Sequence, residues 1–252
     1  MQLPFDFKIA GVGIDSHFLF EVLAYIISYR YYIRLRSNKK DKINSENRFI
    51  IIVGAAGGAF FGSKILGMLE HPSFFMLPTF EKMVFFMSTK TIVGGLLGGL
   101  IGVELVKKII GEKHSSGDLF CFPIILGMMI GRIGCFLSGI EDGTHGIETT
   151  FFLGMDLGDG LKRHPTALYE ILVLAVLWLF LCVSRSKCSF RDGLLFELFM
   201  VFYLWWRFLI EFIKPIYQYD IIGISAIQVA CVCGICYYFL KGCIIYVKNC
   251  KN

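Results

Sequence analysis

The apolar residues of this chain fall into blocks of roughly twenty positions, separated by shorter polar and charged stretches. A helix needs about 20 apolar residues to cross a hydrocarbon core of about 30 Å, so each block is long enough to span a membrane. The pattern predicts an all-α polytopic membrane protein, with about seven spanning helices in one membrane domain over residues 1–252. The expected spans are residues 17–35, 49–69, 91–110, 119–138, 166–183, 194–213 and 221–240.

A further apolar stretch at residues 73–87 is interrupted by Pro78, Glu81 and Lys82. It is too broken to span, because proline and charged side chains are costly inside a membrane helix. We expect this stretch to lie at the membrane interface or to re-enter the membrane.

Basic residues gather in the loops after the first, third, fifth and seventh expected spans, whereas acidic residues crowd the loop at residues 139–165. Because basic loops face the cytoplasm, we expect the N-terminus and the 139–165 loop outside and the C-terminus in the cytoplasm. The formal net charge of +5 therefore bears on orientation, and nucleic acid is not an expected partner. Residues 1–16 lack the pattern of a cleaved signal peptide, so none is expected.

The nine cysteines lie within apolar blocks or near ends expected to be cytoplasmic, which indicates reduced thiols. Cys233 and Cys236 have the spacing of a metal or redox pair, but they lie in an apolar helix without a nearby histidine. Close helix packing is the favoured interpretation. The sequence predicts neither a metal site nor a cofactor.

Glycine recurs at every fourth position of the second and third spans, which favours flat faces and closely packed backbones. These residues are Gly54, Gly58 and Gly62, and then Gly94, Gly98 and Gly102. Gly94 and Gly95 also open the third span, where a lipid headgroup would reach the amides of a helix N-terminus.

The stretch GRIGCFLSGIEDGTHG, residues 131–146, places Arg132 inside an apolar, glycine-rich helix. A guanidinium does not lose its proton in a protein, so Arg132 must meet an anion or water. An ionisable residue within a membrane helix is a candidate functional residue, since an unpaired charge there costs several kcal/mol or more.

A second arginine, Arg207, is expected at the same depth in the sixth span, and Glu211 shares its helical face. His164 and Tyr169, at the outer end of the fifth span, are expected to face the same cavity. Two guanidiniums suit a phosphate, because arginine binds phosphate oxygens with two parallel hydrogen bonds. The residues predict a site for an anionic phospholipid headgroup, and a structural Arg–Glu pair between helices is the alternative.

Three segments of the chain follow one another as GRIGCFLSGIEDGTHG, then HPTALYE at residues 164–170 and RFLIEFIKP at residues 207–215. Together they resemble the signature and two further segments of the prolipoprotein diacylglyceryl transferase family, in family order. The resemblance implies a multi-pass enzyme of the bacterial inner membrane. Such an enzyme moves the diacylglyceryl group of phosphatidylglycerol to the thiol of a lipobox cysteine in a prolipoprotein, and glycerol phosphate leaves.

Carried over residue by residue, the resemblance implies that Arg132 and Arg207 hold the phosphate and that Glu211 orients Arg207. His164 and Tyr169 would line the same cavity. The further residues expected at the substrate are Gly131, Gly134, Cys135, Ser138, Gly139, Glu141, Asp142, Gly143, Gly94, Gly95, Lys64, Lys90 and Tyr25.

The chain departs from the family around the acceptor. Val93 stands where the family has a histidine before its glycine pair, and Cys135 and Ser138 replace two signature asparagines. Without the histidine, an obvious base for a thiol is missing. The sequence therefore predicts a diverged transferase with the same lipid donor and either a lipobox cysteine or a different acceptor. A non-enzymatic membrane protein that binds or moves anionic phospholipid is the alternative.

Overall fold

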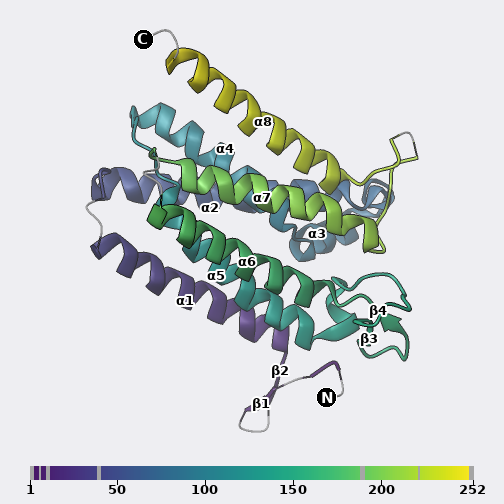
Figure 1. Ribbon diagram of the computed structural model, residues 1–252. Helices are drawn as coiled ribbons and strands as arrows, with labels where there is room; N and C mark the ends of the chain where they lie inside the picture. Colours follow the sequence, from purple (N-terminus) through teal and green to yellow (C-terminus); the bar gives the residue numbers. More distant parts are fainter. Residues whose placement is uncertain are drawn as a thin grey trace. The chain divides into compact units, whose positions relative to one another are not determined.

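The computed structural model describes residues 3–5, 7–9, 12–38, 41–187, 191–220 and 222–249. Ile221, the expected start of the last span, lies outside these ranges. Eight α-helices dominate the described residues, which confirms the all-α class (Figure 1). They are α1 (Ser16–Asn38), α2 (Ser45–Leu69), α3 (Thr79–Ser88), α4 (Ile92–Ile110), α5 (Asp118–Leu137), α6 (Thr166–Lys187), α7 (Leu194–Ile210) and α8 (Ala226–Asn249).

Short elements fill the connections between these helices. Two antiparallel hairpins pair β1 (Phe7–Ile9) with β2 (Val12–Ile14), and β3 (Met155–Asp156) with β4 (Lys162–Arg163). Three 3-10 helices complete the described secondary structure, namely η1 (Pro72–Met76), η2 (Gly139–Asp142) and η3 (Glu211–Ile213). The second hairpin and η2 both belong to the 139–165 loop, which is therefore an ordered part of the fold.

Each expected span overlaps one of the α-helices, α3 being the additional one, although α8 begins five residues later and ends nine residues later than the expected span 221–240. Within the described ranges, α2, α5 and α6 are long and apolar enough to cross a membrane. α3 and α4 would supply a fourth crossing if they are taken together, although they are bent by 83° at their break. The bend agrees with the interrupted pattern at residues 73–87, and the count of seven spans stays a prediction.

The described chain divides into two compact units, and the single membrane domain likewise stays a prediction. The first unit comprises residues 1–40, 115–199 and 212–215, whereas the second comprises residues 41–114, 200–211 and 216–252.

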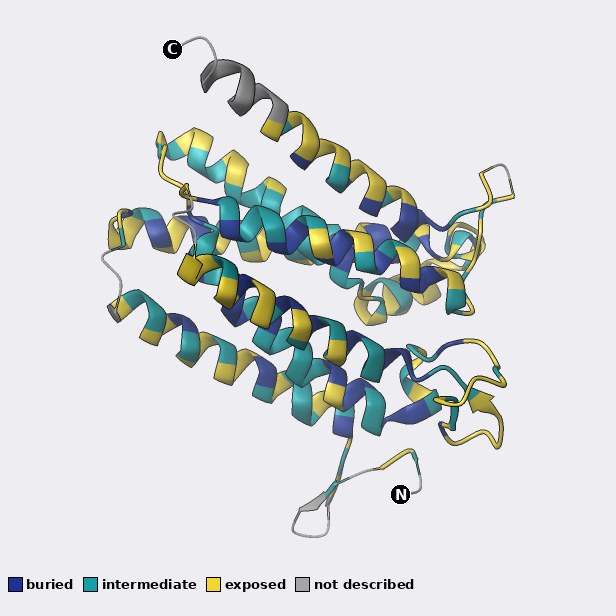
Figure 2. Cartoon of the chain, viewed as in Figure 1, coloured by how far each residue is buried: buried dark blue, intermediate teal, exposed yellow. Residues whose placement is uncertain are grey.

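In the first unit, α5 lies beside α1 and α6 (Figure 1). Tyr32 of α1 stacks on Phe120 of α5 at a centroid distance of 4.6 Å, and Phe122 meets the Trp178 ring of α6 at 4.9 Å. Leu174 and Leu181, one helical face of α6, are fully buried, whereas other faces of α6 expose apolar side chains (Figure 2). A helix that is apolar on all sides suits a lipid environment.

In the second unit, α2 and α4 pack along their glycine ladders, as predicted from the four-residue repeat. A Cβ added at Gly58 would overlap the carbonyl of Gly98, and one added at Gly62 would overlap that of Gly94. The two backbones therefore meet without intervening side chains, which is how helices associate closely in membranes.

Glu70 links two helix ends of this unit. It follows α2 directly, is buried, and accepts a hydrogen bond of 2.7 Å from the backbone amide of Ile227 in the first turn of α8. Burial raises the pKa of the Glu70 carboxyl to about 7, although this hydrogen bond lowers it. A carboxylate at a helix N-terminus satisfies a backbone donor that has no partner within the helix.

Candidate functional site

Arg132 lies in the last third of α5 and is buried, as the apolar sequence around it implies. Its Nε lies 2.9 Å from Oε2 of Glu170 in the second turn of α6, and Glu170 is also buried. One of its terminal nitrogens donates a hydrogen bond of 3.5 Å to Sγ of Cys135, one turn further along α5. The charge of Arg132 is therefore balanced inside the first unit by a carboxylate from the neighbouring helix.

Glycines of α5 let α1 approach this region closely. A Cβ added at Gly134 would overlap Phe20 and touch the backbone of His17, whereas a Cβ at Gly131 would meet nothing within 4 Å. Gly134 is thus required for the α1–α5 contact, and Gly131 leaves open space beside Arg132.

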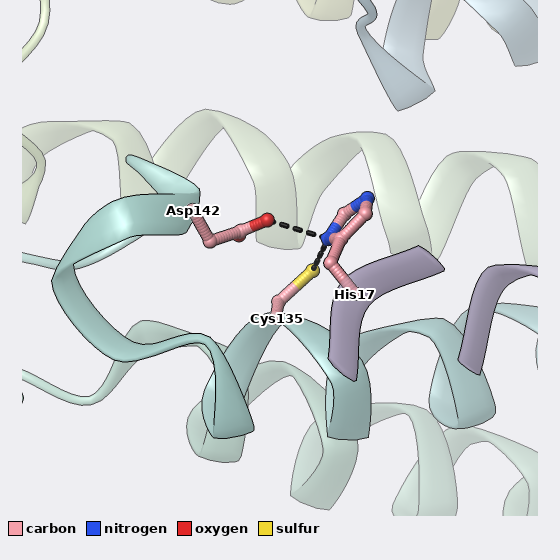
Figure 3. Close-up of side chains that lie close together, drawn as sticks. All are labelled: His17, Cys135 and Asp142. Atoms are coloured by element: carbon pink, nitrogen blue, oxygen red, sulfur yellow. Dashed lines mark hydrogen bonds and ion pairs between the residues drawn. The ribbon is translucent and has the colours of Figure 1, made fainter. Parts of the chain in front are cut away.

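The chain turns back sharply after α5. Gly139 and Gly143 adopt φ angles of +58° and +66°, which favour glycine, and η2 lies between them. This turn brings Asp142 over α5, where its Oδ1 lies 2.5 Å from Nδ1 of His17 in the first turn of α1 (Figure 3). Sγ of Cys135 lies 3.8 Å from the same Nδ1 atom.

The charge of Asp142 is stabilised on both carboxylate oxygens. Thr144 Oγ1 donates a hydrogen bond of 2.5 Å to Oδ2, and His17 contacts Oδ1. Burial alone would raise the pKa of Asp142, but these hydrogen bonds outweigh it and hold the pKa below its ordinary value. Asp142 is therefore a carboxylate at neutral pH.

His164 and Tyr169, both predicted site residues, meet at the start of α6. His164 Nδ1 lies 3.1 Å from the Tyr169 hydroxyl. The His164 carbonyl accepts a hydrogen bond of 2.9 Å from the Gly146 amide, where a Cβ would collide with His164. This contact holds the signature segment against the entrance to α6.

A small cavity of about 10 Å³, the size of one water molecule, lies beside these groups in the first unit. Cys135, Thr144 and Thr166 line part of it, together with Pro165 and Leu157. It adjoins the same end of α5 as the Asp142 turn.

In the second unit, Arg207 forms an ion pair with Glu211, and both side chains are buried. The expected spacing of four residues brings them together across the end of α7, with Glu211 opening η3. Each arginine thus has a glutamate partner within its own unit. The convergence of Arg132 and Arg207 on one cavity stays a prediction.

The remaining predicted substrate residues lie in both units. Ser138, Gly139, Glu141 and Gly143 surround the turn after α5, and Tyr25, on α1, is 70% exposed. In the second unit, Gly94 packs against the Gly62 backbone, and the Gly95 amide donates to the Thr91 carbonyl at 3.0 Å.

Lys64 and Lys90 belong to the same end of the second unit. Lys64 is buried and donates hydrogen bonds to the carbonyls of Met87 and Thr89, at 2.6 and 2.8 Å, where α3 breaks from α4. Lys90 lies in that break. A headgroup role for these residues stays a prediction.

Two residues of this site were not predicted from the sequence. Glu170 is the last residue of the HPTALYE segment, and its place one turn into the helix was the available signal for a buried partner of Arg132. His17 is separated from Cys135 by 118 positions, and no local pattern links them.

Buried arginine–glutamate pairs on apolar helices define a helical membrane protein with a candidate anion-binding site. A family model described as prolipoprotein diacylglyceryl transferase matches residues 4–247. The chain belongs to this family.

The names of three similar proteins agree with the description of the family model. Each is named phosphatidylglycerol–prolipoprotein diacylglyceryl transferase. The protein from Campylobacter hominis is 29% identical over 99% of this chain and 91% of its own length. The protein from Wolbachia pipientis of Culex pipiens is 29% identical over 85% and 83%, and the one from Bordetella parapertussis is 34% identical over 46% and 47%.

Proposed function

We propose that this chain is a transferase of the bacterial inner membrane that moves the diacylglyceryl group of phosphatidylglycerol to the thiol of a prolipoprotein cysteine. The single observation that carries the proposal is the family match over residues 4–247, which includes the segments around Arg132 and Arg207. The relatives' names supply the donor and the acceptor. They favour an enzyme over the alternative of a protein that only binds or moves lipid.

In the proposed reaction, the acceptor sulfur attacks the glyceryl carbon that carries the phosphate. A carbon–sulfur bond forms, the carbon–oxygen bond to the phosphate breaks, and glycerol phosphate leaves with the electron pair. The leaving oxygen gains negative charge, which fixed cations in a water-poor site stabilise strongly. Arg132 is suited to this role because Glu170 and its burial fix the orientation of its guanidinium before substrate binds.

Arg207 is proposed to hold the same phosphate, with Glu211 orienting it through their buried ion pair. His164 and Tyr169 are proposed to line the headgroup cavity, and their contact of 3.1 Å would keep both side chains in place. Gly131, which leaves open space beside Arg132, would let the headgroup approach.

On the acceptor side, Val93 is a buried apolar residue at the position where the family has a histidine that could act as a base. A prolipoprotein thiol remains the proposed acceptor, and another nucleophile is the variant of the proposal. The thiol must then lose its proton to a different group.

The test supplies the purified protein in lipid nanodiscs with labelled phosphatidylglycerol, with and without a lipobox peptide, and measures glycerol phosphate release. We expect release that depends on the peptide, and a loss of about 100-fold or more in Arg132→Ala and Arg207→Ala, since each removes a group that stabilises transition-state charge. Arg185→Ala, at the exposed far end of α6, is the matched control and should keep activity.

Glycerol phosphate release that is equal with and without the peptide would point to a different acceptor. Lipid binding without turnover, in a preparation that elutes as a folded protein, would replace the transferase proposal by the lipid-binding alternative.

A further inference from the structure

His17, Cys135 and Asp142 bring three kinds of metal-ligating atom together in the first unit, one from each of α1, α5 and η2 (Figure 3). Their nitrogen, sulfur and oxygen atoms all lie within 4.8 Å of one another. Imidazole, thiolate and carboxylate are the protein ligands that zinc accepts. Cys135 and the Asp142 side chain are buried, whereas the His17 side chain is partly exposed and points its Nδ1 at the other two residues.

The fold places each of these residues by a separate local device. Asp15 accepts hydrogen bonds from the amides of His17 and Phe18, at 2.5 and 3.2 Å, and so fixes the first turn of α1. Gly134 then lets that turn sit directly against α5. The left-handed Gly143 ends η2 after Asp142.

The carboxylate is oriented as metal ligands commonly are, through a hydrogen bond on its outer oxygen. Thr144 Oγ1 donates to Oδ2 of Asp142 at 2.5 Å, which leaves Oδ1 toward His17 and Cys135. Thr144 is in turn held by Thr166, whose hydroxyl donates to its carbonyl.

The distances allow a common ion after a small adjustment. Ligand atoms about 2.0–2.3 Å from a tetrahedral ion lie about 3.3–3.8 Å apart. The sulfur–nitrogen distance of 3.8 Å already fits, and the nitrogen–oxygen distance of 2.5 Å must open by about 1 Å, within reach of a side-chain rotation.

A divalent cation suits the charges of these ligands. A Cys135 thiolate and the Asp142 carboxylate carry two negative charges, which one divalent ion balances with His17 bound as neutral imidazole. Of the neighbouring charges, Arg132 and Glu170 offset each other at 2.9 Å, and the partly exposed Glu21 carboxylate lies 3.8 Å from the other His17 nitrogen, Nε2.

We propose that His17, Cys135 and Asp142 bind one divalent cation of the zinc class, with one coordination position open. Resting on the proposed function, we further infer that this position takes the acceptor thiol. A metal-bound thiol is deprotonated outright, so its proton goes to solvent and its sulfur is ready to attack. The cation would thereby supply what the missing histidine at Val93 does not.

The test titrates Co²⁺, as a spectroscopic substitute for zinc, into the purified metal-free protein and follows the thiolate-to-cobalt absorption. We expect one Co²⁺ per chain in the wild type and loss of the band in Cys135→Ser. Thr144→Val should bind about 10–100-fold more weakly, because it removes the group that orients Asp142. Cys182→Ser, an exposed thiol of the same unit, is the matched control and should bind as wild type.

Adding the lipobox peptide to the Co²⁺-loaded protein should strengthen the band, since a second thiolate joins the ion, and a serine version of the peptide should not. Absence of a band in the wild type, or an unchanged band in Cys135→Ser, would overturn the metal site and leave the transferase proposal intact. A band that the peptide leaves unchanged would overturn the thiol role alone. If the protein binds Co²⁺ but releases no glycerol phosphate in the transfer assay, the metal site stands and the transferase proposal is overturned.

Discussion

Arg132 and Glu170 form a buried ion pair, and a contribution to fold stability alone does not explain why the pair is present. Moving two charges out of water costs several kcal/mol per ion, and well-packed apolar residues of similar volume often stabilise a fold as well or better. The two side chains lie 2.9 Å apart and are buried at the contact of α5 and α6. The chemistry of the pair, a fixed guanidinium in a dry site, is therefore the better account of its presence.

Removing one partner of this pair should destabilise the fold, because the other charge stays buried. We expect Glu170→Gln to lower the free energy of unfolding by about 3–5 kcal/mol, because it leaves the Arg132 charge buried without its counterion. Denaturant unfolding in detergent, followed by intrinsic tryptophan fluorescence, measures the change.

Glu104→Gln is the matched control, because Glu104 faces Lys107 at 3.9 Å on an exposed part of α4. The control should change the stability by less than about 1 kcal/mol. Equal effects in the two variants would mean that Arg132 does not depend on Glu170.

For single residues, the sequence predicts a contact when the two partners are close together in the chain. Glu211 follows Arg207 by one helical turn, and their pairing could be predicted from that spacing alone. The contact between His17 and Asp142 could not, because it depends on the α1–α5 approach that Gly134 permits and on the turn at Gly143. Only the three-dimensional arrangement turns these distant residues into one cluster.

The α2–α4 pair shows how elements are held together without large side chains. The ladders interlock so that carbonyls of one helix face the α-carbons of the other, at Gly58 with Gly98 and at Gly62 with Gly94. Dispersion contacts between backbones replace the hydrophobic effect, which lipid does not provide between helices.

Gly58→Ala should weaken this contact. The added methyl group would overlap the Gly98 carbonyl, and such overpacking costs about 1–3 kcal/mol. Gly57→Ala, one position earlier on a face where a Cβ meets nothing within 4 Å, should leave stability unchanged or slightly higher, because alanine favours a helix. Thermal unfolding of the two variants in the same detergent gives the comparison, and equal melting temperatures would argue against backbone packing here.

The four-residue glycine repeat made this contact predictable, since a helical face follows from sequence spacing. For the bend of 83° between α3 and α4, the sequence predicted only that the apolar stretch is interrupted. Its geometry depends on Lys64, which reaches from α2 to the Met87 and Thr89 carbonyls freed at the break. No sequence pattern near the break shows which lysine would satisfy those carbonyls.

At the scale of the whole chain, sequence order and spatial grouping differ. The first unit is assembled from residues 1–40, 115–199 and 212–215, so the α2–α4 segment is inserted between α1 and its neighbour α5. Hydrophobic blocks predict the helices but not which of them become neighbours. Membrane orientation, in contrast, follows from loop charges, and it remains a proposal for this chain.

The proposed orientation puts the 139–165 loop outside and the loop after α4, with its three nearby lysines Lys107, Lys108 and Lys113, inside. Alkaline phosphatase fused after Gly160 should be active, because it forms its disulfides only outside the cytoplasm, and the matched fusion after Lys113 should be inactive. A fluorescent protein fused after Asn252 should fluoresce, as expected for a cytoplasmic C-terminus. The reverse pattern would place Asp142 and the signature turn on the cytoplasmic side, where a secreted prolipoprotein does not present its cysteine after export. The orientation therefore decides whether the proposed acceptor can reach the site at all.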